Sequence, residues 1–253
     1  MFEIEFETEA GGGARAHPWQ NSWGMTTRTI GVMVMTHGDD KGVVLPPRVA
    51  QVQAVVIPIP NSKMAAADAA AMAARAEAIA ADLRAAGVRV TVDARENYTP
   101  GWKYAHWELK GVPLRVELGP RDMEGETVLF ARRDTGAKAS APWAGVGAAA
   151  KALLDTVQAE MLVAARARFD ACMETATDWA GFSAALDRRH MVLAPWADEE
   201  AVEEDVKKRS AGPGGMGAKT LCIPFEQPDL PAGTLCFASG KPAVNWALWG
   251  RSY

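Results

Sequence analysis

The stretch from residue 52 to residue 92 alternates between strand-like and helix-like patterns of apolar positions. Residues 52–58 are apolar apart from Gln53, a pattern that is typical of a strand buried on both faces. An alanine-rich segment follows, with Asn61 or Ser62 as its cap and Gly87 as its stop, and this pattern predicts a long helix. Residues 88–92 read as a second strand. Together they predict a βαβ unit with a right-handed crossover.

The next stretch combines a capped helix with a charged strand. Thr99 and Pro100 supply an N-cap and a first-turn proline, which predicts a short helix over residues 101–109. In residues 114–118, apolar side chains alternate with Arg115 and Glu117, so we expect a strand with one charged face. The elements expected beyond it are a strand at 128–132 and helices at 146–175 and 179–188.

Both ends of the chain give shorter signals. Residues 1–8 alternate apolar and acidic side chains, as in a half-buried strand, and a second strand is expected at 17–23. Residues 43–50 read as an extended linker. Near the C-terminus we expect short strands at 191–194, 220–225 and 234–237, a helix at 198–208 and a glycine-rich loop at 211–217.

Two interpretations compete for residues 29–35. Their β-branched and apolar side chains favour a strand. A cap at Thr26 or Thr27 and a stop at Gly38 favour a helix instead.

Composition narrows the class of protein. The 253 residues include no apolar run of the about 18 residues that a membrane span needs, so no membrane partner is expected. The acidic N-terminal segment is unlike a secretory leader, which favours the cytoplasm. Three widely spaced cysteines argue against a disulfide framework. A net charge of −4 argues against sequence-blind nucleic-acid binding over the whole surface, but it allows a local basic patch.

One cluster of residue types suits RNA recognition. Tyr104 and Glu108 are four residues apart and share a helix face, Arg115 lies on the charged strand, and Arg121 follows that strand. A carboxylate can accept from N1–H and N2–H of guanine, and a guanidinium can donate to its O6 and N7. The alternative is a solvated face with ordinary ion pairs.

Three further groups have weaker signals. Arg28 would lie in the first turn of a helix and could clamp a nucleotide phosphate, or it is an ordinary surface arginine. His37, Asp39 and Asp40 offer metal-ligating atoms, but their spacing matches no strong zinc pattern. The loop at 212–217 lacks the Lys-Ser/Thr pair of a phosphate loop.

Taken together, these motifs resemble prolyl-tRNA synthetase of the eukaryotic and archaeal type. Residues 19–35, 37–42 and 45–50 look like its third signature motif and the following linker. The remaining similar stretches match its anticodon-binding domain (96–103 and 107–120) and its extra C-terminal domain (221–225 and 250–253). The resemblance resolves residues 26–37 as a helix.

The resemblance implies an α/β fold. A mixed-sheet anticodon-binding domain (51–175) and a small α+β C-terminal domain (176–253) would follow the end of a class II antiparallel catalytic domain (1–50). The implied activity is ATP-dependent formation of prolyl-adenylate, with magnesium, and transfer of proline to its tRNA by a homodimeric enzyme. Because the family's first and second motifs are missing, we expect a C-terminal fragment that is inactive alone. The alternatives are a stand-alone tRNA-binding module without ligase activity and a βαβ small-molecule-binding domain.

The resemblance also assigns roles to residues. Arg28 takes the place of the catalytic ATP-binding arginine, and Thr26 would help to hold the nucleotide. The residues that would border the proline pocket are Ser22, Trp23 and Gly24. The terminal tyrosine, Tyr253, would reach toward the active site. The implied base-contacting positions are Tyr104, Glu108, Arg115, Arg121 and Lys138, and the proline anticodon carries two guanines.

The family's C-terminal zinc site is degraded in this sequence. Many members hold zinc with four cysteines, and the matching positions here are Ala197, Ala201, Cys236 and Ala238. One thiol cannot form a four-coordinate site, so no zinc is expected. Cys222 is expected to be a small buried hydrophobe.

Overall fold

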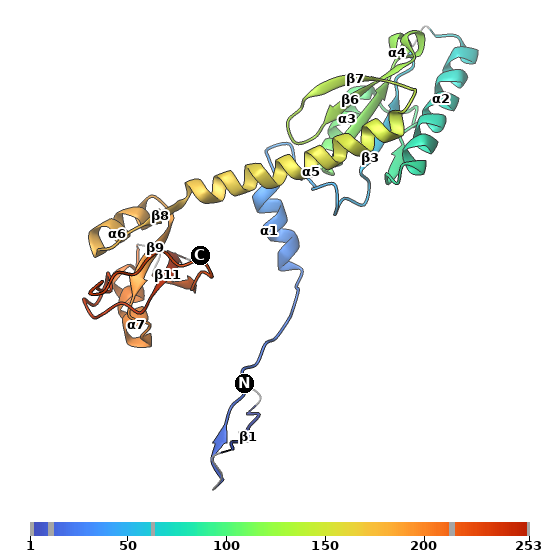
Figure 1. Cartoon of the computed structure of the whole chain (residues 1–253). Helices are drawn as coiled ribbons and strands as arrows, with labels where there is room; N and C mark the ends of the chain where they lie inside the picture. Colours follow the sequence, from blue (N-terminus) through green and yellow to red (C-terminus); the bar gives the residue numbers. More distant parts are fainter. Residues whose placement is uncertain (1–2, 10–12, 62–63, 213–215, 252–253) are drawn as a thin grey trace. The chain divides into compact units, whose positions relative to one another are not determined.

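The computed structural model describes residues 3–9, 13–61, 64–212 and 216–251. Its contacts divide the chain into two compact units, residues 1–158 and 159–253. Helix α5 (Val146–Ala171) begins in the first unit and ends in the second (Figure 1). None of the helices in these residues is both long and apolar enough to cross a membrane.

Most of the described residues before residue 38 are exposed. Strands β1 (Phe6–Glu7) and β2 (Arg15–Ala16) pair antiparallel. Of the half-buried strand predicted at 1–8, residues 1 and 2 lie outside the described residues, and the strand observed in the rest is shorter than expected and exposed. The second strand precedes the predicted 17–23. Residues 29–35 are helical, as the resemblance implies: α1 spans Arg28–His37, and none of its residues is buried.

The first unit is built on a five-stranded mixed sheet with the order β4-β3-β5-β6-β7. Its central strand β3 pairs parallel with β4 and β5, whereas β6 and β7 add antiparallel. The mixed α/β architecture is confirmed, although β7 was not predicted. The strands are β3 (Ala54–Pro58), β4 (Val90–Val92), β5 (Leu114–Leu118), β6 (Thr127–Arg132) and β7 (Lys138–Pro142).

Helices cover both faces of this sheet. Helix α2 (Ala66–Ala85) and the start of α5 share a core with Val56. On the other face, Val55 and Ile57 pack with side chains of α3 (Pro100–Leu109). This division follows from strand geometry, because successive side chains of β3 point to opposite faces. A short helix, α4, spans Pro120–Gly125.

Two local predictions in the first unit need correction. Helix α2 has Ala65 at its N-cap with no side-chain cap, so Asn61 does not cap it; Ser62 lies outside the described residues. The segment 43–50 is more than a linker. Val44 and Ala50 are buried, and the Arg89 guanidinium donates to the Ala50 carbonyl at 2.8 Å. These contacts attach the segment to the sheet domain.

The second unit has a four-stranded sheet with the order β10-β11-β9-β8. Its core is aromatic: Trp249 and Phe182 are fully buried and meet edge to face at 5.9 Å. The elements are β8 (Met173–Thr175), α6 (Trp179–Asp187), β9 (Met191–Trp196), α7 (Glu200–Arg209), β10 (Ala218–Cys222) and β11 (Asn245–Arg251).

Three predictions for this unit are wrong in detail. The long helix ends at Ala171, because residues 173–175 pair with β9 as strand β8. Residues 234–237 form only an isolated bridge, between Leu235 and Pro242. Cys222 is exposed, because it ends an edge strand whose register shifts there.

Candidate nucleic-acid interface

Two faces of helix α3 carry the polar and aromatic side chains of this region. The Thr99 hydroxyl caps it by accepting from the Trp102 backbone N–H at 3.3 Å, and Pro100 occupies its first turn, as predicted. Tyr104 and Glu108 share one face of the helix, toward β5. Residues two positions apart on a helix are about 200° apart, so Trp102 lies on the opposite side from Tyr104.

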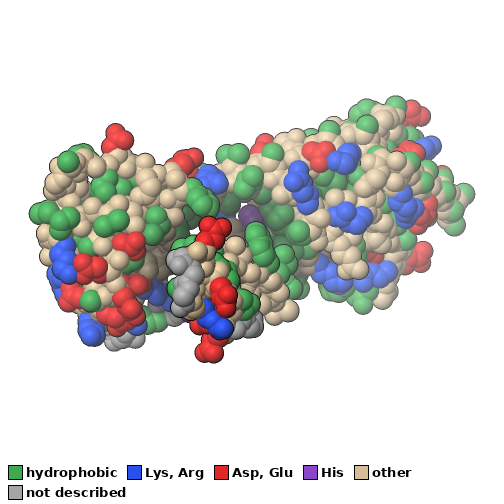
Figure 2. Space-filling view, turned by 60° about the horizontal axis from the view of Figure 1, so that its bottom comes forward, with side chains coloured by type: hydrophobic (Ala, Val, Ile, Leu, Met, Phe, Trp, Pro, Cys, Tyr) green, Lys and Arg blue, Asp and Glu red, His purple; other side chains and the backbone are tan. Residues whose placement is uncertain are grey.

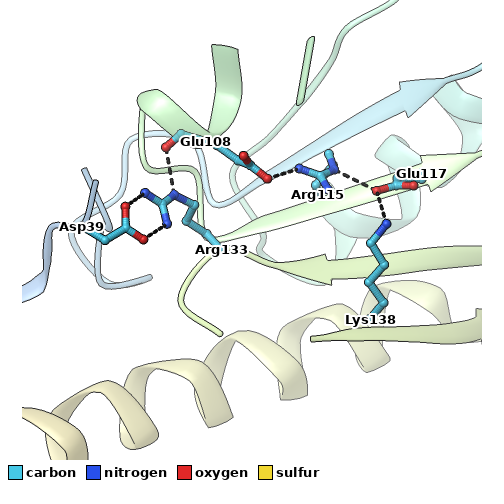
Figure 3. Close-up of polar contacts among 6 residues, drawn as sticks. All are labelled: Asp39, Glu108, Arg115, Glu117, Arg133 and Lys138. Atoms are coloured by element: carbon cyan, nitrogen blue, oxygen red, sulfur yellow. Dashed lines mark hydrogen bonds and ion pairs between the residues drawn. The ribbon is translucent and has the colours of Figure 1, made fainter. Parts of the chain in front are cut away.

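A chain of charged groups joins α3 to the sheet (Figure 3). The Arg115 guanidinium donates to Glu108 Oε1 at 3.0 Å and to Glu117 Oε1 at 2.9 Å. Lys138 Nζ lies 3.7 Å from the same Glu117 oxygen. Because β5 pairs with β3 under α3, and β7 lies beyond β6, residues that are far apart in sequence meet on this face.

Burial separates these four groups into an inner pair and an outer pair. The side chains of Arg115 and Glu117 are only 12% and 8% exposed. Those of Glu108 and Lys138 are 31% and 51% exposed. A ligand therefore reaches one carboxylate and one ammonium, while the inner ion pair holds them in place.

Tyr104 completes the group. The Arg115 guanidinium carbon lies 4.1 Å from the centre of the Tyr104 ring. Burial, helped by the negative charge and hydrogen bond of Glu117, raises the pKa of the Tyr104 hydroxyl well above its usual value. The phenol thus stays protonated.

Arg121 and Glu117 differ in how they lie with respect to this charged group. Arg121 is exposed in the first turn of α4, and among the described residues it makes no ion pair with this group. Glu117 was not predicted as a site residue. Its position two residues after Arg115, on the same strand face, is the signal that places it there.

A second ion pair fastens the end of α3. Arg133, just after β6, binds Asp39 with two hydrogen bonds of 2.7 and 2.6 Å and donates from Nε to the Glu108 carbonyl at 2.9 Å (Figure 3). The Arg133 guanidinium lowers the pKa of Asp39 to about 2. The carboxylate of Asp39, one of the candidate metal ligands, is therefore already paired with Arg133. His37 ends α1.

The candidate residues for ATP and proline do not form a pocket among the described contacts. Ser22, Trp23, Gly24 and Thr26 are exposed and lie outside regular structure. Arg28 is the first residue of α1 and is also exposed. Tyr253 and part of the 212–217 loop lie outside the described residues.

The opposite side of α3 carries a separate hollow. A pocket of about 740 Å³ lies beyond the carboxyl ends of β3 and β4 and is lined by Arg95, Tyr98 and Lys103, among others. Arg95 pairs there with the buried Asp93 at 2.7 Å, and Tyr98 stacks on Trp102 with ring centres 3.8 Å apart. This hollow is distinct from the Glu108 group.

Among the four positions expected to correspond to the family's zinc ligands, Cys236 alone carries a thiol. Cys236 and Ala197 are buried, whereas Ala201 is exposed. Burial raises the pKa of the Cys236 thiol, but hydrogen bonds from the Ser239 hydroxyl and from backbone amides outweigh it, so that the pKa lies below its ordinary value. Within the described ranges, no group of three or more His, Cys, Asp or Glu side chains could hold a metal.

The face shown in Figure 2 carries charged side chains of both signs, and Lys and Arg gather on its right-hand part.

Comparison with known proteins agrees with this architecture. Residues 53–153 match the family model described as an anticodon binding domain, and residues 179–253 match the model for prolyl-tRNA synthetase, C-terminal.

Similar proteins cover the whole chain. The cytoplasmic proline–tRNA ligase of Arabidopsis thaliana is 52% identical over 253 residues, which is 100% of this chain and 47% of that protein. A putative proline–tRNA ligase of Saccharomyces cerevisiae is 39% identical over 270 residues, 100% of this chain and 39% of that protein. The bifunctional glutamate/proline–tRNA ligase of Mus musculus is 42% identical over 263 residues, 100% of this chain and 17% of that protein. The chain thus spans less than half the length of these relatives. It belongs to the prolyl-tRNA synthetase family, whose C-terminal part it matches.

Proposed function

We propose that this chain carries the anticodon-reading part of a cytoplasmic proline–tRNA ligase, with Glu108 as the central base-reading group. The observation that carries the proposal is the half-exposed Glu108 carboxylate, held by a nearly buried Arg115 on an anticodon-binding fold. The substrates of the whole enzyme would be proline, ATP with magnesium and proline tRNA. It would act as a homodimer.

The chemistry fits guanine. The Glu108 carboxylate has lone pairs left after its bond to Arg115, so it can accept from both N1–H and N2–H of the base. Lys138 is exposed enough to donate to O6, N7 or a nearby phosphate. Tyr104 and Arg115 would support the base-contacting surface from below, and Arg121 would contact RNA from α4.

The ATP and proline roles rest on similarity to the family. Arg28 would bind ATP, helped by Thr26, and Ser22, Trp23 and Gly24 would border the proline. The exposed apolar side chains of α1, such as Ile30 and Met35 at 60% and 66%, support a site that other residues complete. Tyr253 would reach toward that site. No resident zinc is proposed.

Binding of tRNA tests the proposal. Proline tRNA is compared with the same tRNA carrying adenine in place of each anticodon guanine. The chain should prefer the unchanged tRNA. Glu108→Gln keeps the shape of the side chain but replaces one acceptor oxygen by a donor, and it should cost about 1–3 kcal/mol of that preference.

The matched control is Glu124→Gln on α4, an exposed glutamate outside the charged group. It should leave the preference unchanged. Equal weakening of both tRNAs by Glu108→Gln would contradict direct base reading. If these 253 residues alone catalysed proline-dependent exchange of pyrophosphate into ATP, this would contradict the view that residues 22–28 need further residues to complete the ATP and proline site. A protein that binds tRNA and supports no ligase activity in any context would favour the stand-alone module.

A further inference from the structure

The segment after α1 is fitted closely against the end of α3. The Val43 N–H donates to the Leu109 carbonyl at 3.3 Å, and the Leu45 N–H donates to the Gly111 carbonyl at 3.2 Å. A Cβ on Gly111 would lie 2.6 Å from the Val43 carbonyl oxygen, and one on Gly42 would lie 2.9 Å from the Leu109 Cα. Both contacts are backbone against backbone. Residues 37–42 have no role in the proposed recognition of guanine. They belong to the segment that packs against the end of α3.

Arg133 binds both the segment after α1 and the end of α3. Its side chain is 3% exposed, and it donates to the Asp39 carboxylate, to the Gly42 carbonyl at 3.3 Å and to the Glu108 carbonyl at 2.9 Å. The Glu108 carbonyl lies in the last turn of α3 and also accepts from the Gly111 N–H at 3.0 Å. The guanidinium adds a second, charged donor to the carbonyl of the residue that carries the proposed base-reading carboxylate, and so helps to fix the end of α3. The planar guanidinium has five N–H donors in a fixed geometry, which suits a carboxylate and two carbonyls better than the compact ammonium of lysine does.

We propose that Arg133 is a positioning residue for anticodon reading, and that Asp39 holds it in place. This inference rests on the proposed function. Glu108 is fixed at two points: Arg115 holds its carboxylate and Arg133 holds its backbone (Figure 3). Glu108 and Arg133 also line one small cavity of about 10 Å³, about the space of one water.

The structure suggests what breaking this link does. Without the Asp39 carboxylate, the buried guanidinium loses its counter-charge and two of its hydrogen bonds. It would then turn toward solvent or toward another carboxylate, its bonds to the Gly42 and Glu108 carbonyls would weaken, and the last turn of α3 would be held less firmly. Glu108 would still be present, but over a wider range of positions. A loss of selectivity should therefore exceed any loss of overall tRNA affinity.

The test measures the ratio of affinities for proline tRNA and for the tRNA with adenine in place of an anticodon guanine. Four forms of the 253-residue chain are compared: the unchanged chain, Asp39→Asn, Asp39→Glu and the control Asp155→Asn. Asp155 forms an exposed ion pair with Lys151 on α5, so its change removes the same charge away from α3. Thermal unfolding of each variant, followed by circular dichroism, confirms that it is folded.

We expect Asp39→Asn to lower the ratio about tenfold, and Asp39→Glu, which keeps a carboxylate at a half-exposed position, to lower it by less than about threefold. Asp155→Asn should not change it. In the double variant with Glu108→Gln, Asp39→Asn should have little further effect, because both act through one group.

Two failures are distinguishable. If the unchanged chain shows no preference, or Glu108→Gln keeps it, the proposed function fails. If Glu108→Gln removes the preference but a folded Asp39→Asn chain keeps the full ratio, only the role of Arg133 and Asp39 is overturned. Equal loss of affinity for both tRNAs in Asp39→Asn would also overturn it, since that result indicates general damage.

Discussion

Arg115 donates a 3.0 Å hydrogen bond to Glu108, so the carboxylate proposed to read the anticodon is already paired before RNA arrives. The same guanidinium is held by the nearly buried Glu117. This pairing fixes one oxygen of Glu108 and leaves the remaining lone pairs for a base edge. A guanine therefore meets a carboxylate whose orientation is set in advance, and binding costs less side-chain entropy.

Removing Arg115 should destabilise the protein more than it removes a contact to RNA. Arg115→Met leaves the almost buried Glu117 with the Tyr104 hydroxyl and the more distant Lys138 as partners, and we expect a loss of about 3 kcal/mol in the free energy of unfolding. Urea unfolding measures it. Adding Glu117→Gln to this variant should recover part of the loss, because the uncompensated charge is gone. No recovery would show that Glu117 is stabilised by other groups.

Gly111 should be far less tolerant of alanine than Gly136. Both have the same left-handed backbone, with φ of +71° and +72°. At Gly111 a Cβ would meet the Val43 carbonyl oxygen at 2.6 Å, whereas at Gly136 it would meet nothing within 4 Å. Gly136→Ala should cost about 1 kcal/mol from backbone conformation alone, and Gly111→Ala clearly more. Equal unfolding midpoints in urea would contradict the close contact between residue 43 and α3.

Asp39 should titrate well below a free aspartate. Its pKa in the folded protein is lowered to about 2 by Arg133, against about 3.9 in an unfolded chain. Because the folded pKa is the lower one, the ion pair stabilises the protein fully above about pH 4, and this contribution is lost as the pH falls toward 2. Carbon NMR of the Asp39 carboxyl measures the midpoint. A midpoint near 4 would mean that the pair with Arg133 does not form in solution.

The C-terminal unit should fold without zinc. Cys236 is one thiol among former ligand positions that now hold Ala197, Ala201 and Ala238. A structural zinc needs four ligands, so metal analysis of purified protein should find far less than one zinc per chain, and a chelator should not shift its unfolding temperature. Stoichiometric zinc, or unfolding by the chelator, would contradict this prediction.

Local rules explain which elements were predictable. Thr99 and Pro100 start α3 because a cap and a first-turn proline act on their own helix, and the apolar run at 52–58 gives β3 because burial on both faces requires it. Local rules failed where pairing decides the structure. Residues 173–175 have helical neighbours but pair with β9, and residues 138–142 join the sheet only because β6 offers an edge.

The same distinction holds for the site. Spacing placed Tyr104 beside Glu108 and put Arg115 on a charged strand face, because helix and strand periods are properties of the backbone alone. Sequence similarity added the family and the other site candidates. Only the tertiary structure showed that Glu117 holds Arg115 and that Arg133 pairs with Asp39, 94 residues away. Such contacts depend on how strands and helices are ordered in space, and no local period encodes that order.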